Sequence, residues 1–200
     1  MRYLAVAALA MLFASTASSQ GRFGIKAGIV LNYINTRGSG GDIYSDLSIG
    51  HTFGASYTMP TSNNFAVQPE FNFVSLKSDE AIGNSTAKFG YVQIPVLLKG
   101  ITNKQAFSVY IGPQLSFLTD ASRKASGGAK TDITKQVTET LFDGVMGIEY
   151  ITPIKISINA RYTHSFSNVF KSEFEGFKSR HQYATVTLGY QFGKRKPVAP

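Results

Sequence analysis

Eight segments of this 200-residue chain alternate apolar and polar residues with a period of two, and this repetition constrains the fold more than any other feature. Period two indicates strands with one apolar face, because successive side chains of a strand point to opposite sides. Each segment is long enough to cross a bilayer as a tilted strand, which takes about 9–11 residues. The segments are 22–34, 47–59, 65–76, 88–100, 106–118, 140–151, 154–166 and 181–192.

The connections between these segments alternate in length. Three are short: 60–64, 101–105 and 152–153. Four are long and polar: 35–46, 78–87, 119–139 and 167–180. Outer-membrane barrels have short periplasmic turns and longer outer loops. The pattern therefore predicts an all-β fold: an eight-stranded antiparallel up-and-down transmembrane β-barrel over residues 20–193.

A soluble lipocalin-like barrel would show the same alternation with its apolar face turned inward. Two features favour an apolar face turned to lipid. The other face is rich in Gly, Ser, Thr, Asn and Gln, which suit a narrow lumen. Aromatic residues also gather at strand ends, as they do at membrane interfaces. We expect a periplasmic belt of Tyr57, Phe65, Phe107, Tyr150, Tyr190 and Phe192, and an outer belt of Tyr33, Phe73, Phe89, Phe117, Phe142 and Tyr162.

The ends of the chain predict its destination. Residues 1–19 combine Arg2, an apolar run and small residues, which is the pattern of a cleaved secretory signal peptide. Residues 194–200 form a basic tail that we expect in the periplasm. The chain has no Cys, which excludes a disulfide framework and thiolate metal sites. With the export signal, the net charge of +8 favours anionic lipid or polysaccharide over nucleic acid.

Charged residues on the predicted inner face are the candidate site. An unpaired charge in a narrow lumen is very costly, so these residues must pair. We expect Glu70 and Glu149 to meet Arg161, Lys26 or Lys99. Such a network could line an ion path or form a polar plug, and the plug is favoured because eight strands leave room only for side chains. The set is Lys26, Glu70, Lys99, Asp143, Glu149, Lys155 and Arg161.

No residue pattern points to catalysis. A lipid hydrolase would need Ser, His and an acid to converge. His164 and His181 flank the last long loop near the outer rim, but His164 and Ser165 are adjacent in a strand and would face opposite ways. We take these histidines, with His51, as interfacial residues. We therefore expect no enzymatic activity, no cofactor and no metal site.

Three prolines lie in neighbouring segments: Pro69, Pro95 and Pro113. Proline cannot donate to a sheet, and a closed barrel has no edge strand to shelter it. The prolines therefore predict local bulges or staggered bonding in the third to fifth strands.

Several segments resemble the outer-membrane β-barrel domain family of Gram-negative bacteria, whose members are labelled porin-family or PorT-family proteins. The segments are "GIKAGIVLNY" (24–33), "QPEFNFVSLK" (68–77), "YVQIPVLLKG" (91–100), "YIGPQLSFL" (110–118) and "INARYTHSFSNV" (158–169). The resemblance covers nearly all of the chain after the signal peptide and implies the barrel fold. It also implies, as an alternative, a PorT-type role in a protein secretion apparatus linked to gliding motility.

The sequence thus predicts an outer-membrane barrel with a filled lumen and a structural, adhesive or binding role through its long outer loops. A narrow channel for ions or small solutes is the alternative. The expected partners are outer-membrane lipid, the barrel-assembly machinery and a possible extracellular ligand at the loops, with no nucleic acid. We expect a monomer.

Overall fold

The computed structural model describes residues 21–38, 41–44, 48–79, 85–102, 106–125, 128, 130–169 and 178–193. The predicted signal peptide, 1–19, and the basic tail, 194–200, lie outside these residues. No helix in the described ranges is long and apolar enough to cross a membrane.

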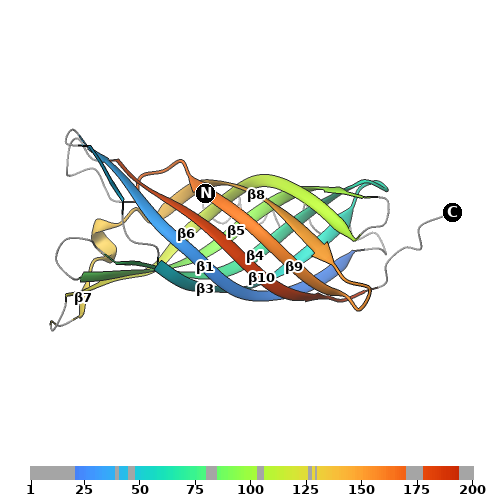
Figure 1. Cartoon of the computed structure of the whole chain (residues 1–200), viewed down its shortest axis with the longest axis horizontal. Helices are drawn as coiled ribbons and strands as arrows, with labels where there is room; N and C mark the ends of the chain where they lie inside the picture. The colour runs from blue at the N-terminus through green and yellow to red at the C-terminus, as the bar shows by residue number, and fades with distance from the viewer. Residues whose placement is uncertain are drawn as a thin grey trace, which may run out of the picture.

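Eight long antiparallel strands form a closed barrel, as predicted (Figure 1). Each strand pairs with its sequence neighbour among the long strands, and the last strand pairs with the first from Gly24–Gln191 to Arg37–Lys178. Closure leaves none of the long strands with an unpaired edge inside the membrane. The long strands are β1 (Arg22–Gly38), β3 (Ser48–Pro60), β4 (Phe65–Asp79), β5 (Ser85–Ile101), β6 (Phe107–Ala125), β8 (Thr140–Ile151), β9 (Ile156–Ser165) and β10 (Lys178–Gln191).

Where their burial is described, the side chains of the long strands alternate between the lumen and the outside, with one interruption at Thr119 in β6. In β5, Tyr91, Gln93 and Lys99 are buried, whereas Leu98 is 53% exposed. The apolar face points outward, which is the arrangement of a barrel in lipid rather than in water. Large apolar side chains on this face include Phe53, Phe71, Val109, Ile111, Met146, Ile158, Val186 and Leu188.

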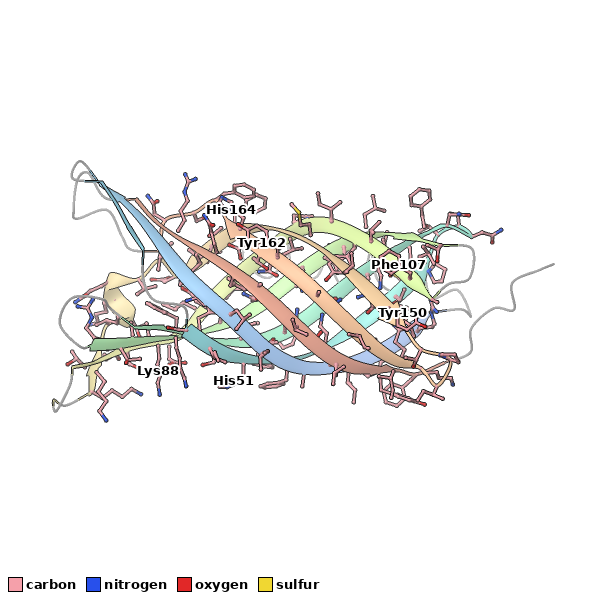
Figure 2. All side chains as sticks on the ribbon, viewed as in Figure 1. His51, Lys88, Phe107, Tyr150, Tyr162 and His164 are labelled. Carbon is pink, nitrogen blue, oxygen red and sulfur yellow. The ribbon has the colours of Figure 1, made fainter. Side chains whose placement is uncertain are left out.

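The aromatic belts lie at the two ends of this apolar face. Figure 2 shows Phe107 and Tyr150 near one end and Tyr162 toward the other. The placement of Phe89 on the outer belt was wrong, because that side chain is only 1% exposed inside the barrel. It shares the inward face of β5 with Tyr91 and Gln93, as strict alternation requires. The side chain of Tyr33 lies outside the described part of the chain.

At one end of the barrel the strands are longer than the sequence predicted. β4 continues to Asp79 and β6 to Ala125, into segments expected to be loops. Two short strands, β2 (Gly41–Tyr44) and β7 (Lys130–Asp132), and the 3₁₀ helix η1 (Thr134–Gln136) add to this end. The prediction stopped where apolar alternation stops, but strand pairing satisfies the backbone of polar residues equally well. We call this the outer end, because the other end has the short turns typical of the periplasmic side.

The prolines interrupt strand pairing without shifting it. Pro69 pairs with Val96 and Asn72 with Gln93, but the residues between them are not bridged; the register is unchanged across the gap. A similar gap separates the Pro95–Gln114 and Leu98–Ile111 pairs. The expectation was bulges or staggered bonding in the third to fifth strands; the structure shows interrupted pairing at the prolines, and the shift of register lies elsewhere in the same strands. The register of the β5–β6 pairing shifts at Gly90/Tyr91, nearer the outer end, where Thr119 is the extra residue between Leu118 and Asp120.

A glycine beside these gaps permits very close contact between strands. A Cβ atom on Gly112 would lie 2.1 Å from the carbonyl oxygen of Val96. Real Cβ atoms do not approach backbone oxygen so closely, so any side chain here would force β5 and β6 apart. Gly100 offers a contrast, because its Cβ would meet no atom nearer than 3.6 Å.

We expect Gly112→Ala to destabilise the barrel by about 1–3 kcal/mol, the usual cost of overpacking. Gly100→Ala is the matched control and should be close to neutral. The measurement is the temperature at which the folded band converts to the unfolded band in a heat-modifiable gel shift. Equal conversion temperatures for the two variants would contradict the close-contact argument.

Candidate functional site

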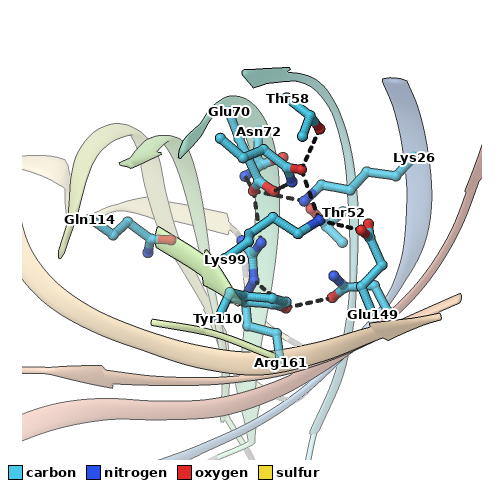
Figure 3. Close-up of polar contacts among 12 residues, drawn as sticks. Lys26, Thr52, Thr58, Glu70, Asn72, Lys99, Tyr110, Gln114, Glu149 and Arg161 are labelled. Atoms are coloured by element: carbon cyan, nitrogen blue, oxygen red, sulfur yellow. Dashed lines mark hydrogen bonds and ion pairs between the residues drawn. The ribbon is translucent and has the colours of Figure 1, made fainter. Parts of the chain in front are cut away.

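Glu70 is the centre of a charge network in the periplasmic half of the lumen (Figure 3). Its Oε2 atom accepts from Lys26 Nζ at 2.7 Å and from Arg161 Nη2 at 2.8 Å. The neighbouring amides Asn72 and Gln68 donate to the same carboxylate at 3.1 and 2.8 Å. β1, β4 and β9 thus meet at one buried carboxylate, across the barrel.

Arg161 is held by an aromatic ring as well as by Glu70. Its Nε donates to the Tyr110 hydroxyl at 3.3 Å, and its guanidinium carbon lies 5.3 Å from the centre of that ring. The hydroxyl of Tyr110 in turn donates to Asn159 Oδ1 at 2.8 Å. The contacts with Glu70 and Tyr110 fix the guanidinium in one orientation.

A second ion pair, between Lys99 and Glu149, connects to the first through an amide. Lys99 Nζ contacts Glu149 Oε2 and also donates to Gln68 Oε1 at 2.9 Å. The Thr58 hydroxyl donates to that same Oε1 at 2.6 Å. Gln68 therefore bridges Lys99 and Glu70, and the two ion pairs form one network. Breaking one partner of such a pair costs more than the pair itself contributes, because a buried charge is left without compensation.

Two members of the predicted set lie outside this network. Asp143 is buried nearer the outer end and accepts from Ser116 Oγ at 2.5 Å and Gln114 Nε2 at 3.0 Å. Lys155 was expected on the inner wall, but β9 begins only at Ile156. Lys155 instead adopts φ 70° in the short turn after β8, where its carbonyl accepts from the Gln191 backbone N–H. The turn between β8 and β9 spans residues 152–155, two residues more than the predicted connection 152–153, and this places Lys155 outside the wall.

An apolar cluster fills the lumen on the outer side of the charge network. Sequence reasoning missed it, because it assigned the whole inward face to polar side chains. The signal was present in the inward positions of one strand, β5, since alternation from Gln93 puts both Tyr91 and Phe89 inside. The buried wall residues of the cluster are Val30, Val74, Leu76, Ala87, Phe89, Tyr91, Ala121, Leu141 and Tyr183.

Segments beyond the wall strands complete this cluster. Ile133 and Val137, on either side of η1, are 5% and 0% exposed, and Val169 is also buried. Backbone bonds hold them in place: Ile133 N–H donates to Ala121, and Thr138 N–H to Val169. The expectation that 119–139 is a polar loop was therefore wrong in two respects: the segment contains strand and 3₁₀ structure, and Ile133 and Val137 are buried in the lumen. Hydrogen bonds from the side chain and the backbone N–H of Thr134 lower the pKa of Asp132, beside η1.

The three histidines do not converge on a common point. His181 points inward against the ring edges of Phe89 and Tyr91, whereas His51 and His164 lie on the outward side (Figure 2). Ser165 is buried and donates to the carbonyl of Ser167 rather than to a histidine. Among the described residues, no three His, Cys, Asp or Glu side chains are grouped as metal ligands.

Fold and lumen together define an outer-membrane β-barrel protein. The sequence model of the family described as "Outer membrane protein beta-barrel domain" matches residues 4–192, so this chain belongs to that family and is located in the outer membrane. No curated protein sequence matches the chain.

Solved structures agree on the fold. Neisserial surface protein A (NspA) is 16% identical with a TM-score of 0.58, and the match covers 85% of this chain and 97% of NspA. Ail, the attachment invasion locus protein of Yersinia pestis, in complex with the heparin analogue sucrose octasulfate, is 15% identical with a TM-score of 0.52, over 86% of this chain and 99% of Ail. At these identities the similarity concerns architecture alone.

We expect Arg161→Met to lower stability by about 3 kcal/mol or more, because Glu70 loses its strongest partner. The heat-modifiable gel shift measures this as a lower conversion temperature. The triple variant Lys26→Met/Glu70→Gln/Arg161→Met should recover part of the loss, since it removes both cations together with the carboxylate that they share. A single variant as stable as the native barrel would show that the network contributes nothing to folding.

Proposed function

We propose that this protein is a non-conducting outer-membrane barrel that acts by binding at its outer end, rather than as a channel or an enzyme. The observation that carries the proposal is that the lumen is filled in two successive layers. The first is the network around Glu70, and the second is the apolar cluster around Tyr91.

The two layers oppose solute passage for different reasons. An ion entering from the periplasm would have to separate Glu70 from two cations, at the cost of several kcal/mol for each buried charge exposed. It would next meet a mainly apolar layer closed by Ile133 and Val137. The Tyr183 hydroxyl in this layer is already bound by Gln93 and Gln114, so the layer is a poor replacement for the hydration shell of an ion. Passage would require both layers to rearrange together.

The outer end is the part of the molecule available for binding. β4, β5 and β6 continue past the apolar belt, and β7 pairs with β6 there. The periplasmic end offers only short turns, such as the one between β8 and β9. We further propose that the barrel is a monomer, since its long strands close on one another, and that Tyr190 and Phe192 of the last strand are presented outward to the assembly machinery.

In planar bilayers we expect the purified protein to show no steady conductance at neutral pH. The physical reason is the double filling of the lumen. An open porin reconstituted in the same bilayer is the positive control, and a heat-modifiable gel shift of the same preparation confirms that the barrel is folded.

The alternative of a narrow channel makes the opposite prediction. Steady ohmic conductance from the folded native barrel, altered in ion preference by Glu70→Gln, would overturn the proposed function. Brief spikes without a stable open level would not support a channel, because they arise when any protein disturbs a bilayer during insertion.

A further inference from the structure

The outward face of β4, β5 and β6 changes character in regular rows toward the outer end. One row, Phe73–Val92–Phe117, is apolar. The next row is Ser75–Gly90–Asp120, and the row beyond it is Lys77–Lys88–Ser122. Residues paired across neighbouring strands share a face, so the two lysines lie side by side on the outside of the wall.

A second lysine pair lies beside the first. Lys124 of β6 pairs with Lys130 of β7, and Thr86, the β5 partner of Lys124, shares the outward face of Lys88. We call the four residues Lys77, Lys88, Lys124 and Lys130 the lysine face.

Like charges placed directly opposite each other destabilise a sheet. Among the described residues, no carboxylate lies within ion-pair distance of Lys77, Lys88 or Lys124. Asp132 interacts with Lys130 and offsets part of the charge at the far edge of the face. The side chain of Asp79, two residues after Lys77, lies outside the described part of the chain. Lys77 and Lys88 thus present two adjacent positive charges to which an anionic group could bind.

The height of the lysine face fits the headgroup layer of the membrane. Lys77 follows Phe73 by four residues, which is about 13 Å along a strand. A strand tilt of about 40° reduces this to roughly 10 Å above the last apolar row. The headgroup layer of one leaflet is about 5–8 Å thick, and a lysine side chain can bend back over that distance. Figure 2 shows Lys88 farther toward the outer end than His51 and Tyr162.

We propose that the lysine face binds the phosphate groups of glycolipid in the outer leaflet. This deepens the proposed binding role by naming the ligand class. Lipid is favoured over a soluble polyanion because the lysines lie on the outside of the wall, facing the surrounding bilayer. They lie two rows beyond the last apolar row, Phe73–Val92–Phe117. Asp120 lies in the row beneath them, at a level where a lipid-bound divalent cation could contact it.

The test uses the full-length folded protein in neutral detergent, titrated with bisphosphorylated lipid A and followed by native mass spectrometry. Each lysine near an anionic surface contributes about fivefold to affinity, so Lys77→Gln/Lys88→Gln should weaken binding by about 30-fold. Lys77→Arg/Lys88→Arg should retain binding. Lys135→Gln, on η1 and outside the lysine face, is the matched control and should leave affinity unchanged.

Two further measurements, with dephosphorylated lipid A and with sucrose octasulfate, decide the source of the phosphate. Dephosphorylated lipid A should bind the native protein as weakly as the double variant binds lipid A. Equal affinity of native protein and double variant for lipid A would overturn the proposal. The proposal would also be overturned if the double variant no longer bound sucrose octasulfate but bound lipid A as tightly as the native protein. The lysine face would then bind a soluble polyanion rather than lipid. Bilayer conductance is measured separately. Failure to bind lipid A would therefore leave the proposal of a filled lumen unaffected, and steady conductance would overturn the filled-lumen proposal without affecting lipid binding.

Discussion

Closure of the sheet between β10 and β1 is the constraint on which the rest of this structure depends. A bilayer offers no hydrogen-bonding partner, so each backbone group inside it must be satisfied by another strand. With eight strands, closure also fixes a narrow interior. The polar side chains that face inward are not in contact with bulk water, so they must form hydrogen bonds and ion pairs with one another. The ion pairs of Glu70 follow from this geometry before any question of function arises.

The interior solves this packing problem in two ways along its length. In the periplasmic half, long side chains with opposite charges reach across the lumen, and amides such as Gln68 connect them. In the outer half, rings and aliphatic side chains pack as they do in a water-soluble protein core, with Ile133 and Val137 supplied from outside the wall. The charge network links strands on opposite sides of the lumen. The apolar cluster packs side chains across the outer half of the lumen.

Much of the fold could be predicted from the sequence because strand alternation in a lipid-facing barrel is repeated eight times. The inward positions of Glu70, Lys99 and Arg161 follow from the same parity. The sequence predicted only a group of possible ion-pair partners for these residues. Which side chains meet across the lumen depends on the tilt of the strands and on the offset between neighbouring strands, and the sequence of one strand encodes neither. The prediction for Lys155 was wrong because the turn after β8 takes two more residues than expected, and β9 begins only at Ile156. The apolar cluster was missed because its members come partly from the inward face of strands and partly from the polar segment 119–139. Neither sequence pattern by itself indicates that these residues contact each other.

The extra residue Thr119 divides β6 into two parts with opposite parity. Below it, even-numbered residues such as Gln114 and Ser116 face the lumen; above it, the odd-numbered Ala121 does. Without this insertion, Lys124 would project into the mouth of the barrel and Ala121 toward the outside. Thr119 thus reverses which residues of β6 face the lumen. Even-numbered residues face inward within the membrane, and odd-numbered residues face inward above it. A deletion of one residue there would exchange the inner and outer surfaces of everything that follows in the strand.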